Sequence, residues 1–271
     1  MKILFLDLDG TLLNDEKEIT RGNREALQKA LDAGHRVVIT TGRPTCSARI
    51  QNERLGLNGP GCYIIAYNGG VIYDCGAEKP IYENFLPAEV AIKAVRLCNT
   101  LDVHAQTYDD THIVVEPNHH PDAVVKYSNF SGLPYRQVDT FEGNIGPAVP
   151  KVLVISYGDR PKLERAHDLL CKELAGEADC FYSSKSFMEV VKPGLNKGTA
   201  ITRLCGMLNI PIENSIACGD QQNDILMLKT AGLGVAMANA IDEAKAAADY
   251  VTVNDNNHDA IAEVVEKFVL V

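Results

Sequence analysis

The chain lacks the long hydrophobic run that a membrane-spanning helix requires. None of its 271 residues belongs to a stretch of roughly 18 consecutive apolar residues, the length that such a helix needs. The apolar run at residues 3–6 is too short for a signal peptide. The eight cysteines include no C-x-x-C pair. We therefore expect a cytoplasmic protein with reduced cysteines and no membrane partner.

An excess of positive charge is also missing. Lysine and arginine number 26 against 36 aspartates and glutamates, which gives a net charge of −10. Without a global basic field, we expect no nucleic-acid partner, and an anionic substrate would need local cations or a metal ion. The patterns G-x-x-x-x-G-K-[ST] and G-x-S-x-G are absent, so the sequence gives no support for a nucleotide P-loop or a serine hydrolase.

The first and last parts of the chain alternate short apolar runs with helical patterns. This alternation predicts a parallel sheet with both faces covered by helices. The predicted strands of these parts span residues 2–6, 37–39, 63–66, 215–218, 233–237 and 250–253. The predicted helices span residues 20–32, 45–55, 197–208, 224–231, 241–248 and 258–269.

The middle of the chain has a different pattern, which begins near Asn84. Helices are predicted at 87–101 and 160–174, and strands at 113–116, 152–157 and 189–191. The whole therefore predicts an α/β fold, a doubly wound, Rossmann-like parallel-sheet core with an inserted α+β cap domain. The core comprises residues 1–82 and 192–271, and the cap residues 83–191. We expect the active site between them, with hinges near Tyr82 and Pro193. The adjacent His119 and His120 precede Pro121, which indicates a loop rather than a metal site.

Polar residues follow several of the predicted core strands. In open α/β sheets, ligands bind beyond the carboxyl ends of the strands. The segments at these ends, together with one lysine that opens a predicted helix, are Asp7-Leu8-Asp9-Gly10-Thr11, Thr41-Gly42-Arg43, Lys197, and Gly219-Asp220 through Asn223-Asp224. The set supplies several carboxylates, a cation and hydroxyl donors.

These residue types suit phosphoryl transfer. Asp7 could attack phosphorus and form an aspartyl-phosphate. Clustered carboxylates need a cation, and oxygen ligands favour Mg²⁺. The metal, Lys197 and the Thr41 hydroxyl would neutralise the phosphoryl oxygens. Asp7 and Asp9 share one side of an extended segment, so Asp9 could protonate the leaving oxygen and later deprotonate water.

In their order along the chain, these motifs resemble those of the haloacid dehalogenase superfamily, specifically its Cof-like phosphatases with a large α/β cap (class IIB). The resemblance covers essentially the full chain. It implies that Asp7 is the nucleophile and Asp9 the general acid and base. It places Thr41, Gly42, Lys197 and Asn223 around the phosphate, and it places Asp7, the Asp9 carbonyl, Asp220 and Asp224 around Mg²⁺. It also implies that Arg43 and Asn68 lie near the substrate. The family often has glycine at positions 221, 238 and 260, where this chain has Gln221, Ala238 and Ala260.

The resemblance implies a Mg²⁺-dependent phosphatase that hydrolyses small phosphomonoesters, such as sugar phosphates or phosphorylated cofactors. Its partner would be a small phosphorylated metabolite, and the sequence leaves the oligomeric state open. Two alternatives remain. One is a sugar phosphotransferase or phosphomutase that uses the same Asp7 intermediate. The other is a non-catalytic protein that binds phosphorylated metabolites, although such a protein has no need of the nucleophile.

Overall fold

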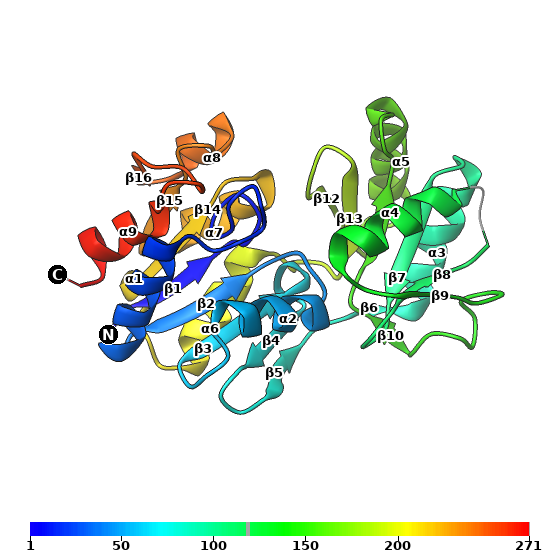
Figure 1. Ribbon diagram of the computed structural model, residues 1–271. Coiled ribbons are helices and arrows are strands. Elements are labelled where there is room, and N and C mark those ends of the chain that lie inside the picture. Colours follow the sequence, from blue (N-terminus) through cyan, green and yellow to red (C-terminus); the bar gives the residue numbers. More distant parts are fainter. Residues whose placement is uncertain (118–119, 271) are drawn as a thin grey trace. The chain divides into compact units, whose positions relative to one another are not determined.

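A computed structural model describes residues 1–117 and 120–270 of the chain. The chain forms two compact units (Figure 1). Unit 1 comprises Met1–Tyr82 and Asn196–Val271, and unit 2 comprises Glu83–Leu195. In the described part of the chain, no helix has both the length and the apolar composition needed to cross a membrane.

Unit 1 contains an eight-stranded sheet in the order β16-β15-β14-β1-β2-β3-β4-β5. Its strands are β1 (Ile3–Leu6), β2 (Arg36–Thr40), β3 (Cys62–Ala66), β4 (Val71–Asp74), β5 (Lys79–Glu83), β14 (Ser215–Gly219), β15 (Leu233–Ala236) and β16 (Tyr250–Val251). The pairs from β16 through to β3 are parallel, and β4 runs antiparallel to β3. Strands β1, β3 and β14 are buried along their whole length, as expected for apolar runs in a covered parallel sheet.

Helices precede, connect and follow the parallel strands of unit 1. They are α1 (Arg21–Asp32), α2 (Thr45–Leu55), α6 (Lys197–Met207), α7 (Ile225–Thr230), α8 (Asp242–Ala247) and α9 (Ala260–Phe268), with short 3-10 turns η1 (Tyr67–Gly69), η2 (Ile212–Asn214) and η3 (Gln222–Asp224). From β1 the chain winds one way through β2 to β3, and from β14 the other way through β15 to β16. The winding direction therefore reverses between β1 and β14, where open α/β sheets bind their ligands. The predicted doubly wound core is confirmed.

Unit 2 contains a six-stranded sheet in the order β12-β13-β11-β7-β8-β9. Its strands are β7 (His104–Tyr108), β8 (Ile113–Val115), β9 (Tyr135–Gln137), β11 (Val152–Ile155), β12 (Asp179–Tyr182) and β13 (Phe187–Val191), and a separate pair is formed by β6 (Leu86–Pro87) and β10 (Ala148–Val149). Helices α3 (Ala88–Thr100) and α5 (Arg160–Glu173) share one hydrophobic core with the sheet. Val95 and Leu170 of these helices pack there with Val154 and Val190 of the strands. Unit 2 is thus an α+β unit.

Several elements of both units were not predicted from the sequence. The strands and the helix among them are β4 and β5 of unit 1, and β6, β7, β9, β10, β12 and helix α4 (Pro121–Ser131) of unit 2. The prediction of a loop at Pro121 was wrong, because this proline is the first residue of α4. Proline is favoured there because the first helical N–H has no intrahelical acceptor to lose. His119 lies outside the described residues.

Candidate active site

The ends of β1 and β14 bring the two acidic motifs to one edge of the sheet. Leu6 is paired with Cys218 in the parallel register, so Asp7 and Asp220 follow neighbouring strands within two residues of that pair. The Asp7 N–H donates to the Cys218 carbonyl at 3.0 Å, which extends the strand pairing to the first residue of the motif. Both carboxylates are buried, as expected at the carboxyl edge of a covered sheet.

Lys197 joins two carboxylates at the centre of this edge. Its side chain is fully buried, and its Nζ lies 2.5 Å from Asp7 Oδ1 and 2.6 Å from Asp224 Oδ1. Burial alone would lower the pKa of Lys197, but the charges of Asp224 and Asp7 outweigh it and raise the pKa. The two carboxylates therefore favour the charged form of Lys197. It is placed by α6, which begins at this residue and is capped by Asn196.

Asp7, Asp220 and Asp224 form a compact group of buried carboxylates. One oxygen of each lies within 4.8 Å of the others, a spacing that a metal ion could bridge. Burial and the neighbouring carboxylates raise the pKa of Asp7, although Lys197 opposes the shift, and burial and Asp224 raise the pKa of Asp220 to about 6. Three carboxylates against one lysine leave an excess of negative charge that a second cation would offset. The oxygen-only donor set fits Mg²⁺.

The loop after β14 is organised by the Asp224 side chain. Its Oδ2 accepts hydrogen bonds from the backbone N–H groups of Asp220 and Gln221, both at 2.9 Å. Asp220 is in turn fixed by the Thr11 hydroxyl, which donates to its Oδ1 at 2.9 Å. Each acidic side chain thus has a set orientation. Asp224 serves the loop and Lys197, whereas Asp220 keeps free lone pairs for a cation.

Gly10 is required by two separate features of this edge. Its φ of +86° lies in the left-handed region that disfavours side chains. A Cβ at this position would lie 2.6 Å from Asp220 Oδ2. The glycine of the first motif therefore lets the chain turn beside the Asp220 carboxylate.

The Asp9 carboxylate is bound by two cations. Arg43 donates through Nε to Oδ2 at 2.8 Å and through Nη2 to Oδ1 at 2.7 Å. Lys17 Nζ reaches Oδ1 at 2.9 Å. Burial opposes the effect, but Arg43 and then Lys17 lower the pKa of Asp9. Arg43 is expected near the substrate. It is buried, and it binds Asp9, the residue predicted to be the general acid and base.

The second motif is tied to the turn after β3. The Asn68 N–H donates to the Thr41 carbonyl at 3.0 Å, and the Thr41 hydroxyl accepts the Arg43 N–H at 3.1 Å. Asn223 donates through Nδ2 to Asn68 Oδ1 at 3.1 Å. The structure therefore brings Asn68 and Asn223 together beside the Thr41-Gly42-Arg43 segment. The roles that the resemblance gives to these residues stay predictions.

Sequence reasoning missed several residues that support the site. Lys17, which binds Asp9, lies in a loop and has no motif around it. Asn239 donates through Nδ2 to the Gly10 carbonyl at 2.8 Å, and Asn256 donates to the Leu13 carbonyl at 3.1 Å.

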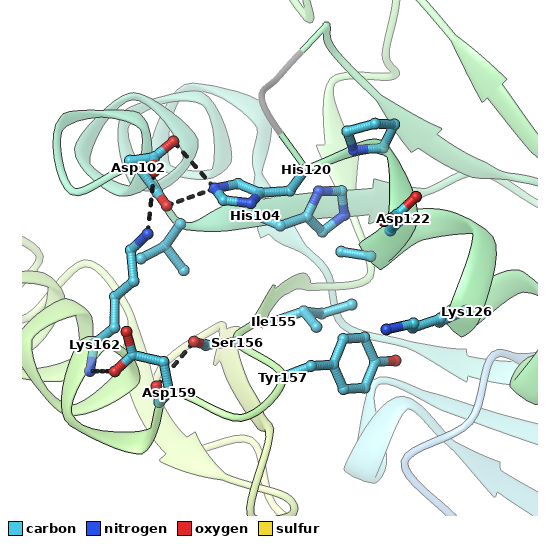
Figure 2. A pocket seen from close by; sticks show the side chains of 13 residues that line it. Asp102, His104, His120, Asp122, Lys126, Ile155, Ser156, Tyr157, Asp159 and Lys162 are labelled. Atoms are coloured by element: carbon cyan, nitrogen blue, oxygen red, sulfur yellow. Dashed lines mark hydrogen bonds and ion pairs between the residues drawn. The ribbon is translucent and has the colours of Figure 1, made fainter.

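Unit 2 has a hollow of its own, of about 270 Å³, beside the beginnings of α4 and α5 (Figure 2). Lys162 Nζ lies 3.2 Å and His120 Nε2 3.1 Å from the Asp102 carboxylate. Lys126 lies over the Tyr157 ring, with Nζ 5.4 Å from its centroid. The Asp102 carboxylate thus engages both Lys162 and His120, and the Tyr157 ring also lines the hollow. The hollow lacks the concentrated negative charge of the group in unit 1.

The sequence matches that of a known family. A family model described as haloacid dehalogenase-like hydrolase matches residues 4–265. The chain belongs to this family. It is 32% identical over 273 residues to the pyridoxal phosphate phosphatase YbhA of Escherichia coli strain K12, with 97% of both chains covered. It is 31% identical over 293 residues to the 5-amino-6-(5-phospho-D-ribitylamino)uracil phosphatase YwtE of Bacillus subtilis strain 168, with 98% of both covered.

A solved structure supports the same assignment. The crystal structure of a haloacid dehalogenase-like hydrolase from Bacteroides thetaiotaomicron superposes with a TM-score of 0.88 at 37% identity, and 98% of each chain is covered. The family predicted from the four motifs is therefore confirmed, and the protein is a hydrolase.

Proposed function

We propose that this hydrolase is a Mg²⁺-dependent phosphatase that hydrolyses small phosphomonoesters through an aspartyl-phosphate on Asp7. The observation that carries the proposal is the buried Asp7–Lys197–Asp224 arrangement beside Asp220, at the point where the sheet reverses its winding. A buried nucleophilic carboxylate, a buried lysine and an oxygen-lined cation site are the components that phosphoryl transfer needs.

In the first step, Asp7 attacks phosphorus and the bond to the leaving oxygen breaks. Lys197 lies close enough to Asp7 to contact a phosphoryl oxygen at the same time, and its raised pKa keeps it charged. The Thr41 hydroxyl and the backbone of Gly42 are proposed as further donors. Preorganised donors of this kind stabilise developing negative charge without reorganising during the reaction.

Asp9 is proposed to protonate the leaving oxygen and then to take a proton from water. Arg43 and Lys17 hold it as a carboxylate here, which is the form needed for the second step. For the first step it must carry a proton, so its contacts with Arg43 and Lys17 must loosen when the phosphoryl group enters. Arg43 and Lys17 are therefore proposed to influence the protonation of Asp9 in the first step.

Asp7, Asp220 and the Asp9 carbonyl are proposed to hold Mg²⁺, with Asp224 beyond them. The bound ion would neutralise charge on the phosphoryl oxygens and on the crowded carboxylates. Unit 2 is proposed as the cap that reads the leaving group. The relatives named for pyridoxal phosphate and for a phosphoribitylamino-uracil are consistent with sugar phosphates or phosphorylated cofactors as substrates.

The test is phosphate release by the purified protein over a panel of sugar phosphates and phosphorylated cofactors. Each assay is run with Mg²⁺, with excess chelator, and with a free sugar as an added acceptor. We expect release that requires the metal and does not depend on the sugar. Release that occurs only as transfer to the sugar would favour the phosphotransferase, and binding without release would contradict the proposal.

A further inference from the structure

Asn68 occupies a backbone conformation that few residues adopt. Its φ is +55°, and the preceding Tyr67 has a φ of +52°. Two successive non-glycine residues in the left-handed region form an uncommon and costly arrangement. Asparagine tolerates this region better than most residues, so the conformation alone could explain its presence. The side chain supplies a separate observation.

The Asn68 amide is completely buried, and only one side of it is paired. Its Oδ1 accepts the hydrogen bond from Asn223 Nδ2 at 3.1 Å. Its Nδ2 has no hydrogen-bond partner among the described residues. A buried amide N–H without a partner is unfavourable, and such groups are rare in native proteins. Asn23 of α1 also has a buried, unpaired Nδ2, so the inference depends on what surrounds Asn68.

Asn68 is bonded to two of the segments that the proposed function places around the phosphoryl group. The Asn68 N–H is bound to Thr41, and Asn223 belongs to the loop that follows Asp220. The next residue, Gly69, lies against the start of α6, because a Cβ there would be 2.8 Å from the Asn196 carbonyl. Asn68 is thus held at fixed points beside Thr41 and near the helix that carries Lys197.

We propose that Asn68 Nδ2 donates a hydrogen bond to an oxygen of the substrate's phosphoryl group, and that Asn223 fixes the orientation of the amide for this purpose. The inference rests on the proposed phosphatase function and assigns it one further donor. The Asn223 contact occupies Oδ1, so the NH₂ group is the part of Asn68 left for an anion. A carbonyl oxygen there would repel the phosphoryl group, whereas the NH₂ group attracts it.

The decisive variant is Asn68→Gly, because glycine accepts the positive φ without strain and removes only the amide. We expect kcat/KM to fall by about 100-fold, the scale of losing one preorganised oxyanion donor. The inhibition constants of inorganic phosphate and orthovanadate, which lack a leaving group, should rise as well. The unfolding midpoint in urea should stay the same or increase. Asn68→Asp, which keeps the shape but replaces the donor by a carboxylate, should lose at least as much activity.

Asn23 provides a matched control in α1. It is also fully buried, its Oδ1 accepts the Ala262 N–H at 2.9 Å, and its Nδ2 also has no partner among the described residues. Asn23→Ala should lower stability and leave kcat/KM and phosphate inhibition unchanged. If Asn68→Gly retains kcat/KM and phosphate inhibition within about twofold of the wild type, Asn68 serves only the backbone and the inference is wrong. If the wild type itself binds neither phosphate nor vanadate, the proposed function fails and the inference fails with it.

Discussion

Asp220 is expected to destabilise the metal-free protein. Its pKa of about 6, against an ordinary value of 3.8, means that the folded state resists its ionisation. A shift of about two pH units corresponds to about 3 kcal/mol at neutral pH. Asp220→Asn removes this charge, and the Thr11 hydroxyl that now donates to Oδ1 can rotate to accept from the new amide. In excess chelator the variant should therefore be more stable than the wild type, by up to about 3 kcal/mol.

The direction of the pH dependence of stability follows from which state, unfolded or folded, loses the Asp220 proton first. The unfolded chain loses the Asp220 proton near its ordinary pKa of 3.8, before the folded chain loses it near 6. The free energy of unfolding of the chelated wild type should therefore fall as the pH rises from about 4 to about 6, and this contribution should be flat above. Asp220→Asn should lack this component of the fall. Mg²⁺ should stabilise the wild type and have little effect on the variant.

Urea denaturation at several pH values, with chelator and with Mg²⁺, measures these differences. Glu263→Gln, in the same unit, is a control for which we expect the opposite change in stability. Although burial opposes it, hydrogen bonds from Tyr250 and from backbone N–H groups lower the pKa of Glu263, so this variant should be less stable at neutral pH. A chelated Asp220→Asn protein that is less stable than the wild type at pH 7 would refute the electrostatic account of the site.

Two further variants test the same edge of the sheet. Lys197→Met leaves the buried Asp7 and Asp224 carboxylates without their shared cation, so it should lose activity and about 3 kcal/mol of stability, measured in urea; an unchanged midpoint would show that the carboxylates are otherwise paired. Gly10→Ala places a Cβ against Asp220 at a φ of +86°, so it should weaken Mg²⁺ binding in calorimetry and lower stability. Wild-type metal affinity in Gly10→Ala would mean that the Asp220 side chain is not needed for the ion.

The alternating part of the fold could be predicted because its signals are local. The helix predicted at 45–55 has the same bounds in the structure, and it ends at Gly56 in the left-handed conformation that stops many helices. Buried parallel strands such as β1 are continuous apolar runs. The rule that ligands bind at carboxyl ends then places Asp7 and Asp220 together.

Strand β7 shows why the rest could not be predicted. All five of its residues are buried, yet His104 and Gln106 are polar. They are satisfied by a chain of hydrogen bonds along one face, from His104 to Gln106 and from Gln106 to Tyr108. The polar character of His104 and Gln106 argues against a buried strand, and the sequence does not indicate that each has a hydrogen-bond partner two positions away. Strand β4 follows β3 through the short turn η1 and runs antiparallel to it, so it falls outside the strand–helix alternation that predicted the other core strands.

The candidate site could likewise be predicted only in part. Motif residues follow strands, so their positions are set by the sheet. Lys17 binds Asp9 from a loop whose path depends on Asn256 and other distant contacts. Nothing in the local sequence indicates such a contact. The pairing of Asn68 with Asn223 likewise joins positions 155 residues apart.

The central claim is that Asp7 carries the phosphoryl group during turnover. The most direct measurement is to quench the enzyme with acid during turnover in Mg²⁺, reduce it with borohydride and sequence the peptide that contains residue 7 by mass spectrometry. Borohydride converts an aspartyl-phosphate to homoserine. We predict homoserine at position 7, its absence in chelator, and a folded Asp7→Asn protein that has lost turnover by orders of magnitude. Unmodified Asp7 together with near-normal turnover in Asp7→Asn would contradict the account.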